Sequence, residues 1–213
     1  MQTMLVDPAV SLGGRRYGYL LDEGFRRSGR FVYRHQCPTC SACVPVRIPV
    51  ARFRPDRAQR RCLRRNADLQ LRIIGTPDLD EHLGLFQRYL QARHPGGGMD
   101  QTSRDDYVDM LNDRHCDVFL IECRLQGHLL AVAVTDQTPR GLSAMYTFFD
   151  PDHPGRGLGS FAILLQIGEA LHRGLPHLYL GYWIPGSAKM AYKSRFRPIE
   201  GLVDGTWRPL PDL

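Results

Sequence analysis

Lysine is almost absent from this sequence of 213 residues, because only Lys189 and Lys193 contribute lysine to its 28 basic residues. No run approaches the roughly 18 apolar residues that a membrane-spanning helix needs. No basic segment followed by an apolar stretch stands near the start, so we expect no secretory signal and a cytoplasmic protein without a membrane partner. Internal repeats and low-complexity segments are also missing, which argues against a repeat architecture.

What remains is typical of a globular protein, with 43% hydrophobic and 23% charged residues. The length suits one large domain or two small ones. The net charge of +6 is unevenly placed, since residues 1–66 hold fourteen arginines against four acidic residues, while residues 67–213 are net acidic. Such asymmetry indicates a polyanionic partner. A general preference for arginine would raise the arginine content but would not concentrate it in one third of the chain.

Three of the six cysteines stand at even spacing, at Cys37, Cys40 and Cys43. Thiolates spaced this way can bind zinc or an iron–sulfur cluster, but a closed site of either kind needs a fourth ligand, such as His35 or a remote residue. The alternative is a compact turn in which cysteines pack as small hydrophobic residues. We therefore predict no metal cofactor. The other three cysteines are expected in the core: Cys62, Cys116 and Cys123.

From residue 67 onward the hydrophobic periodicity predicts a mixed α and β order. The expected strands are Leu69–Ile74, Asp117–Arg124, His128–Thr135, Leu142–Phe149, "HLYLGYWI" and a last strand near Pro198–Val203. The expected helices are Leu79–Arg93, a helix capped by Ser103, Phe161–Leu171 and a short helix capped by Ser187. This order resembles the GNAT acyltransferase fold, in which amides after a Gly-rich loop, here Gly155–Ser160, bind a pyrophosphate. We predict a small, basic, cysteine-containing region (1–66) followed by a GNAT-like domain (67–213).

Three long motifs occur in order: "GFRRSGRFVYRHQCPTCSACVPVRIPVARFRPDRAQRR", "MYTFFDP" and "LGYWIPGSAKMAYKSRFRPIEGL". Together they resemble the bacterial aspartate/glutamate leucyltransferases, which are related to the arginyl-tRNA–protein transferases. The resemblance covers nearly the whole chain. It implies an enzyme that moves leucine from leucyl-tRNA to the α-amino group of proteins beginning with Asp or Glu and so marks them for degradation by the N-end rule. Aminoacyl-tRNA is then a co-substrate.

One departure from the family pattern concerns the start of the chain. Family members carry a further cysteine in a "CPYLPG"-like segment, whereas this chain has none before Cys37. Either the start is truncated or misassigned, or this protein does without the segment. Three other functions stay open: a CoA-dependent N-acetyltransferase, an arginyl-tRNA–protein transferase and a non-catalytic RNA-binding module. The residues alone do not separate a leucyl from an arginyl donor.

A helix is expected to begin at Pro55, with Asp56 in its first turn. It carries a basic face with no acidic residue between Arg57 and Arg65. Guanidinium groups pair with phosphates in a bidentate manner, and such contacts give affinity without sequence readout. The alternative is a solvated charged surface. We predict that tRNA is bound by Arg52, Arg54, Arg57, Arg60, Arg61, Arg64 and Arg65.

The two lysines stand four residues apart and would share one face of a helix. A carboxylate between them would offset their repulsion, so they are candidate readers of the acceptor's first residue; the alternative is two surface lysines. Further candidates for the acceptor site are Tyr146, Tyr182, Trp183 and Ser187. Tyr192 is the candidate group for stabilising the oxyanion or protonating the leaving ribose oxygen. His94 and His153 are possible bases, and Arg26, Arg27 and Arg47 are alternative carboxylate readers.

Overall fold

The computed structural model describes residues 2–93, 103–111 and 114–210. Its strands are β1 (Thr3–Leu5), β2 (Arg26–Ser28), β3 (Phe31–His35), β4 (Val44–Pro49), β5 (Gln70–Ile74), β6 (Asp117–Leu125), β7 (His128–Thr138), β8 (Gly141–Phe149), β9 (His177–Trp183), β10 (Glu200–Val203) and β11 (Thr206–Pro209). Its helices are α1 (Gly13–Asp22), α2 (Arg57–Arg65), α3 (Leu79–Arg93), α4 (Arg104–Met110) and α5 (Leu158–His172), with 3-10 turns η1 (Val50–Arg52), η2 (Pro154–Arg156) and η3 (Ala191–Arg195).

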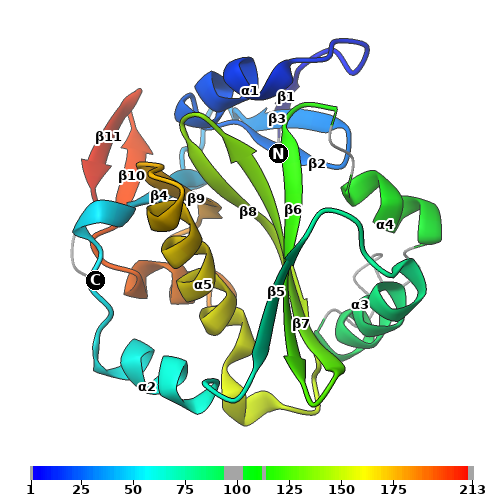
Figure 1. The fold of residues 1–213 in the computed structure, drawn as a ribbon. Coiled ribbons are helices and arrows are strands. Elements are labelled where there is room, and N and C mark those ends of the chain that lie inside the picture. Colours follow the sequence, from blue (N-terminus) through cyan, green and yellow to red (C-terminus); the bar gives the residue numbers. More distant parts are fainter. Residues whose placement is uncertain (1, 94–102, 112–113, 211–213) are drawn as a thin grey trace.

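One eight-stranded sheet organises the molecule, in the order β11-β10-β4-β9-β8-β7-β6-β5. All its neighbours are antiparallel except β8 and β9, which run parallel. Helices α3 and α4 lie on one side of the sheet and α5 lies on the other (Figure 1). The GNAT-like order expected from the sequence is therefore confirmed, with α5 starting three residues earlier than predicted.

The alternating side chains of β7 serve both faces of the sheet, because successive residues of a strand point to opposite sides. Val132 and Val134 pack with Phe86 of α3 in one core cluster. Ala133 joins the other cluster, in which Ile167 of α5 is buried. Because helices cover β7 on both sides, the part of it that packs in these clusters is a continuous apolar run and does not alternate with polar residues.

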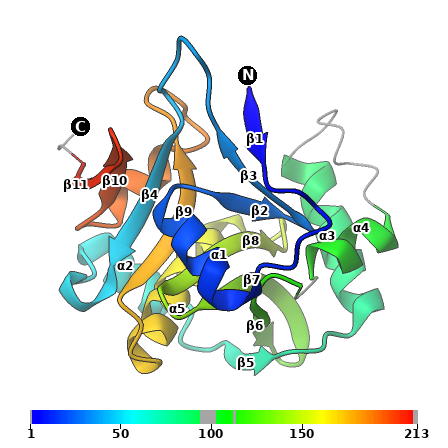
Figure 2. The same cartoon turned by 90° about the horizontal axis from the view of Figure 1, so that it is seen from above.

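The first 66 residues are divided between two sheets. Strands β1, β3 and β2 form a separate three-stranded sheet that crosses above the large one, next to α1 (Figure 2). Strand β4, in contrast, lies inside the large sheet between β9 and β10. The regions 1–66 and 67–213 thus share one sheet, and the boundary at residue 66 stays a prediction.

A buried ion pair fastens the small sheet to the large one. Arg27 of β2 donates from Nε to Asp136 Oδ1 of β7 at 2.9 Å, and both side chains have 0% exposure. Tyr17 of α1 donates to the other carboxylate oxygen at 3.2 Å. Burial alone would lower the pKa of Arg27, but the Asp136 carboxylate outweighs burial and raises it. The arginine is therefore charged and fully engaged.

Two local predictions were wrong. No α-helix forms after Ser187; its carbonyl accepts from Met190 and Ala191, and the segment continues as the 3-10 turn η3. Helix α2 begins at Arg57, with Asp56 as its N-cap rather than in its first turn. Asp56 and Gln59 form a reciprocal capping box, which satisfies two otherwise unpaired amides. Among the described residues, no helix is long and apolar enough to cross a membrane.

Replacing Arg27 by Met should destabilise the protein by about 3–5 kcal/mol, because Asp136 would be left buried without its cation. Replacing Arg104, whose ion pair with Asp80 is exposed, should cost less than about 1 kcal/mol. Denaturant unfolding measures both. The double variant Arg27→Met/Asp136→Leu should recover most of the loss, and an Arg27→Met effect no larger than that of Arg104→Met would refute this anchoring role.

Candidate functional site

Strands β8 and β9 separate soon after they meet. They pair only at Leu142–Leu178 and Ser143–Tyr179. Just beyond these pairs, Arg26 of β2 donates from Nη2 to the Ala144 carbonyl at 3.0 Å and from Nη1 to the Tyr179 carbonyl at 3.3 Å. The guanidinium therefore bridges the two strands at the point where they diverge, through one backbone carbonyl of each. We call the region where the two strands diverge, from Arg26 onward, the strand split.

Gly181 shows how tightly Arg26 is held. A Cβ atom on Gly181 would lie 3.3 Å from three atoms of the Arg26 guanidinium group, and the glycine has a φ of +80°. A side chain here would be strained and would also displace Arg26. The absence of a side chain at Gly181 thus allows the arginine to lie flat against β9.

Lys193 lies beside Arg26 in the strand split. Its residue exposure is 8%, and Nζ donates to the Tyr182 carbonyl at 2.6 Å. Burial, followed by the charge of Arg26, lowers the pKa of Lys193 to about 7. Since an unperturbed lysine has a pKa near 10.4, the ammonium form is strongly disfavoured here. Lys193 is therefore close to half-charged at neutral pH.

Aromatic side chains line the same region. The Tyr182 ring lies 4.6 Å from that of His35 and 6.3 Å from that of Tyr33, measured between centres. On another side, Tyr146 of β8 meets Tyr89 of α3 at 6.4 Å. The Tyr182 hydroxyl donates to the Gly24 carbonyl at 2.9 Å and accepts from the His35 amide at 3.2 Å. Because that hydroxyl is fully used, Tyr182 supports the site rather than supplying a reactive group.

Tyr192 keeps 41% of its surface exposed, yet partial desolvation raises its pKa, with smaller effects from Tyr89 and Arg26. It therefore stands near both the aromatic pair and the buried arginine. In chemical terms it is a neutral hydroxyl at neutral pH, able to donate a hydrogen bond at the edge of the strand split. Its predicted catalytic role remains a prediction.

No acidic group neutralises this site among the described residues. The charges that act on the pKa of Lys193, Tyr146, Tyr182 and Tyr192 come from arginines and tyrosines alone. Arg26 itself is bonded to backbone carbonyls. A buried cation without a counter-ion is costly, typically several kcal/mol. The arrangement is thus suited to an anionic ligand that supplies the missing charge.

The predicted pairing of the two lysines on one helix face was wrong. Lys189 is exposed in a turn, whereas Lys193 is buried in η3. Residues four apart share a face only in an α-helix, and this segment is a turn followed by a 3-10 helix. Of the other acceptor candidates, Trp183 packs in the main core cluster and Ser187 is half-buried in the turn.

Of the alternative readers, only Arg26 lacks a carboxylate partner. Arg27 is fixed to Asp136. Arg47 donates to Asp22 at 2.9 Å and Glu200 at 3.0 Å, and it stacks on Trp207. Neighbouring arginines in "GFRRSGR" look alike in the sequence, so the pattern gave no means of ranking them. Tyr89 was missed because it belongs to no motif with known chemistry, and His35 was considered only as a possible metal ligand of the cysteine turn.

Helix α2 adjoins the Gly-rich loop that precedes α5. Arg65 donates to the Gly155 carbonyl, and Asn66 Nδ2 donates to the Arg156 carbonyl at 3.0 Å. Arg156 in turn pairs with Asp68 through two bonds of 2.8 Å. The carbonyls of the loop thus accept hydrogen bonds from side chains at the end of α2. The first amides of α5, in contrast, have no hydrogen-bond partner inside their own helix. The exposed basic face and the helix start are thereby joined into one surface.

The seven arginines predicted to bind tRNA fall into two groups. Four are engaged by the protein: Arg52 pairs with Glu200 at 2.7 Å, and Arg54, Arg60 and Arg65 donate to backbone carbonyls. The remaining three are exposed, and their side chains have no hydrogen bond or ion pair within the described chain: Arg57, Arg61 and Arg64. These three are the strongest candidates for phosphate contacts.

The cysteine turn differs from the packed cluster that we expected. Cys37 and Cys40 face each other in an isolated bridge, but Cys40 is exposed and the other two are half-buried. Among the described residues, no group of three or more His, Cys, Asp or Glu side chains is arranged to hold a metal ion. Cys116 and Cys123 are buried as predicted, and Cys62 is only half-buried. His94 lies outside the described residues.

The parallel strands that split, the Gly-rich start of α5 and the three-strand meander β6–β8 define a GNAT-like acyltransferase fold. The same fold occurs in the C-terminal domain of a putative lysylphosphatidylglycerol synthetase from Agrobacterium fabrum. That structure has a TM-score of 0.53 and 16% identity, covering 71% of this chain and 50% of that chain.

Two family models match the sequence: "Arginine-tRNA-protein transferase, N terminus" over residues 2–61, and "Arginine-tRNA-protein transferase, C terminus" over residues 81–203. An aspartate/glutamate leucyltransferase of Stenotrophomonas maltophilia (strain K279a) is 52% identical over 96% of this chain and 84% of its own. One from Thiobacillus denitrificans (strain ATCC 25259 / T1) is 46% identical over 98% and 87%. The chain belongs to the arginine-tRNA–protein transferase family.

The scarcity of lysine allows a direct test of the buried ammonium. Lysine labelled with ¹³C at the ε-carbon should give two signals by NMR, assigned with the variant Lys189→Met. We expect the Lys193 signal to titrate near pH 7, because burial and Arg26 disfavour its charged form. A Lys193 signal that titrates near the unperturbed value of about 10.4 would contradict this burial.

Proposed function

We propose that this protein transfers leucine from leucyl-tRNA to the α-amino group of proteins that begin with Asp or Glu. The observation that carries the proposal is the pair of buried cations, Arg26 and Lys193, which have no carboxylate partner among the described residues. An acidic first side chain supplies the missing charge. Two family models and leucyltransferase relatives at 46–52% identity support the reaction class. We place the reaction in the cytoplasm, where bacteria hold their aminoacyl-tRNA.

The chemistry needs few reactive groups. An aminoacyl-tRNA ester is already activated, and an α-amino group has an unperturbed pKa near 7.7–8.0, so part of it is neutral at cellular pH. The amine attacks the ester carbonyl directly, the C–N bond forms, and the C–O bond to the ribose breaks. The enzyme contributes positioning and hydrogen bonds to the developing oxyanion. Tyr192, exposed at the edge of the strand split, is the donor that we assign to this oxyanion or to the leaving ribose oxygen.

A transfer assay decides between the reaction classes. Purified protein and a peptide that begins with Glu are incubated with labelled leucyl-tRNA, arginyl-tRNA or acetyl-CoA. Transfer of leucine alone supports the proposal. Transfer of arginine would identify arginyl-tRNA as the donor, and acetylation would indicate a CoA-dependent enzyme. Binding of tRNA without any transfer would indicate a non-catalytic RNA-binding module.

The tRNA surface that we propose consists of Arg57, Arg61 and Arg64 together with the start of α5. Guanidinium groups on α2 would pair with acceptor-stem phosphates. The free amides at the start of α5, beginning at Leu158, would receive the last phosphates of the 3′ end, because a helix N-terminus favours an anion. The bonds between α2 and the Gly155–Gly157 loop keep these two parts in register.

Replacing Arg57, Arg61 and Arg64 by Ala should weaken tRNA binding and flatten its salt dependence. The log–log slope should fall by roughly one unit for each phosphate that the variant no longer neutralises. The matched control changes three exposed arginines elsewhere, Arg15, Arg16 and Arg72, which removes the same charge. Fluorescence anisotropy of labelled tRNA at several salt concentrations measures both. Equal slopes for the two triple variants would mean that the arginines of α2 contact solvent and not the phosphates of tRNA.

The acceptor carboxylate should be read by Lys193 with Arg26. A hydrogen bond to a charged group contributes about 1.5–3 kcal/mol, so a peptide starting with Gln should react roughly ten- to a hundredfold less efficiently than one starting with Glu. Lys193→Met should remove most of this preference while leaving leucyl-tRNA binding near normal. Lys189→Met is the matched control, since Lys189 is exposed. Initial rates against peptide concentration provide the comparison.

The pH dependence follows from the lowered pKa of Lys193. Below pH 7 the side chain is charged and attracts the carboxylate; above pH 7 the free enzyme loses that proton, so the KM for Glu peptides should rise. Bound carboxylate favours the charged form, which moves this rise to a somewhat higher pH in the complex. Gln peptides should show no such change. An unaltered Glu preference in Lys193→Met, or the same KM profile for both peptides, would leave Lys193 outside the reader.

A further inference from the structure

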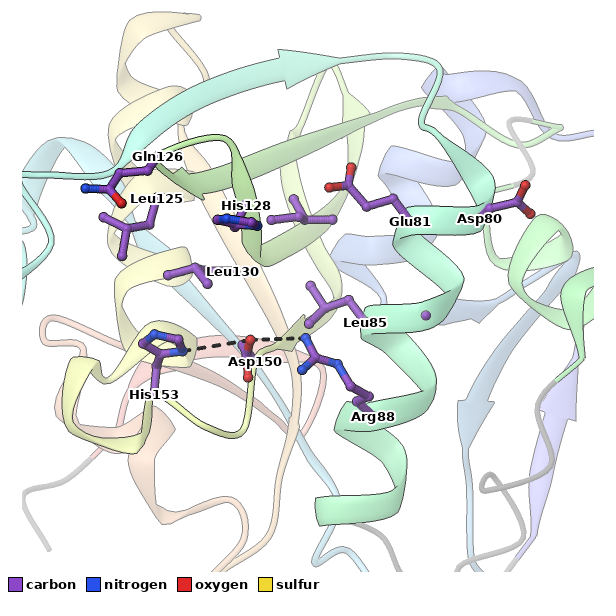
Figure 3. Close-up of a pocket in the computed structure, with 12 residues that line it drawn as sticks. Asp80, Glu81, Leu85, Arg88, Leu125, Gln126, His128, Leu130, Asp150 and His153 are labelled. Atoms are coloured by element: carbon purple, nitrogen blue, oxygen red, sulfur yellow. Dashed lines mark hydrogen bonds and ion pairs between the residues drawn. The ribbon is translucent and has the colours of Figure 1, made fainter.

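A cavity of about 540 Å³ lies at the edge of the sheet, away from the strand split. Three elements enclose it: the first half of α3, the turn between β6 and β7, and the loop from β8 to α5 (Figure 3). Arg88 comes from α3, His128 is the first residue of β7 after the turn, and Asp150 and His153 come from the loop (Figure 3). The cavity lining includes neither the cations of the strand split nor the three exposed arginines of α2.

The cavity combines an apolar wall with a polar rim. Leu85 and Leu129 line it and are 3% and 6% exposed. The rim presents the Arg88 guanidinium, which is half exposed, and the imidazole of His128, which is exposed. Flat cationic and imidazole groups above an apolar surface suit the face of a nucleobase, which stacks on such planes in single-stranded RNA.

Asp150 is a fixed acceptor inside this rim. It is 7% exposed, and its Oδ1 accepts from the Asp152 amide at 2.9 Å. Its Oδ2 accepts from Arg88 Nη2 at 3.1 Å, across the cavity (Figure 3). The carboxylate is thus held in place at the end of β8, with Arg88 as its neighbouring donor.

His153 has a ring nitrogen without a hydrogen bond in the same place. Its Nδ1 is buried and makes no hydrogen bond in the described chain; its contact with Asp150 Oδ2, at 3.8 Å, is an ion pair only when the imidazole is protonated (Figure 3). A buried polar atom without a hydrogen bond is unusual in a folded protein. A ligand with both donor and acceptor groups would satisfy His153 and share Asp150 with Arg88.

The position of the cavity narrows the choice of ligand. His153 directly precedes η2 and the start of α5, where the proposed function places the last phosphates of the tRNA 3′ end. The nucleotides of this end are unpaired and finish in cytidine, cytidine and adenosine in every tRNA. A cytosine offers an amino donor, which aspartate accepts, and two acceptors for donors such as Arg88.

We propose that this cavity binds the base of the penultimate cytidine of leucyl-tRNA, with Asp150 accepting from its amino group. The inference rests on the proposed function and adds the site that recognises the tRNA end. Arg88 and His153 complete the contact by donating to the ring nitrogen and the carbonyl of the base. A uridine at this position presents a carbonyl where the amino group stood, so it faces the Asp150 carboxylate unfavourably.

The test compares two leucyl-tRNAs, charged chemically, that end in the natural sequence or carry uridine in place of the penultimate cytidine. The wild type should use the uridine form roughly tenfold less efficiently. Asp150→Asn should reduce this discrimination to about twofold or less, because an amide accepts from cytosine and donates to uracil. Equal use of both tRNAs by the wild type would overturn the proposal.

A second variant does not depend on Asp150, which also holds its loop. Gly84 lines the cavity, and a Cβ atom added there meets no atom within 4 Å outside its chain neighbours and the backbone of its own helix. Gly84→Trp should partly fill the cavity and raise the KM for leucyl-tRNA about tenfold at little cost in kcat. Gly168→Trp is the matched control, since Gly168 is also an exposed helical glycine with open space. Equal effects of the two variants would count against the cavity.

The two proposals fail in different ways. Anisotropy with uncharged tRNA of both sequences measures base preference without any transfer step. A wild type that prefers the natural end but transfers no leucine would refute the proposed activity and keep the cavity as an RNA site. A wild type that transfers leucine yet shows no base preference in either assay would refute the cavity alone.

Discussion

The ion pair between Arg27 and Asp136 is the constraint on which the candidate site depends. Both side chains are fully buried, and charged groups are tolerated at such a place only because they are paired with each other. Arg27 fixes the position of β2 over β7, and successive residues of a strand point to opposite sides. Arg27 is directed toward Asp136 of β7. Its neighbour Arg26 is therefore directed toward the strand split, where it donates to carbonyls of β8 and β9. A structural anchor and the arginine without a carboxylate partner are thus adjacent residues of one three-residue strand.

That geometry explains why lysine, so rare in this chain, occupies position 193. Arg26 already places a permanent charge in the strand split, because a guanidinium does not lose its proton in proteins. A second arginine beside it would add an equally permanent repulsion. Lysine can release its proton when the site is empty and regain it when a carboxylate arrives. The lowered pKa of Lys193, near 7, places that exchange in the physiological range.

The sequence predicted the elements that have a strong local signal. Helix α3 follows its apolar periodicity, and α4 begins at the Ser103 cap as predicted. Strands β1 and β2, with three residues each, are too short to show a pattern and were missed. The site was harder, because the spacing of Lys189 and Lys193 has meaning only in an α-helix. The choice of Arg26 over Arg27 depends on partners more than a hundred residues away, which no local pattern records.

Strand β8 sets the distance between the proposed reader of the acceptor's carboxylate and the proposed site for the tRNA end. Arg26 bonds to Ala144 near its start, and the cavity and the Gly-rich loop begin at Asp150, just after its last residue. Six residues of extended strand cover about 20 Å. Because β8 is paired with β7 along its length, this distance is fixed by the sheet and not by a flexible loop. If Arg26 reads the acceptor's carboxylate and the cavity binds the tRNA end, the acceptor's first residue, the leucyl ester and the terminal adenosine must together span this interval along β8. Free leucine is too short to span it.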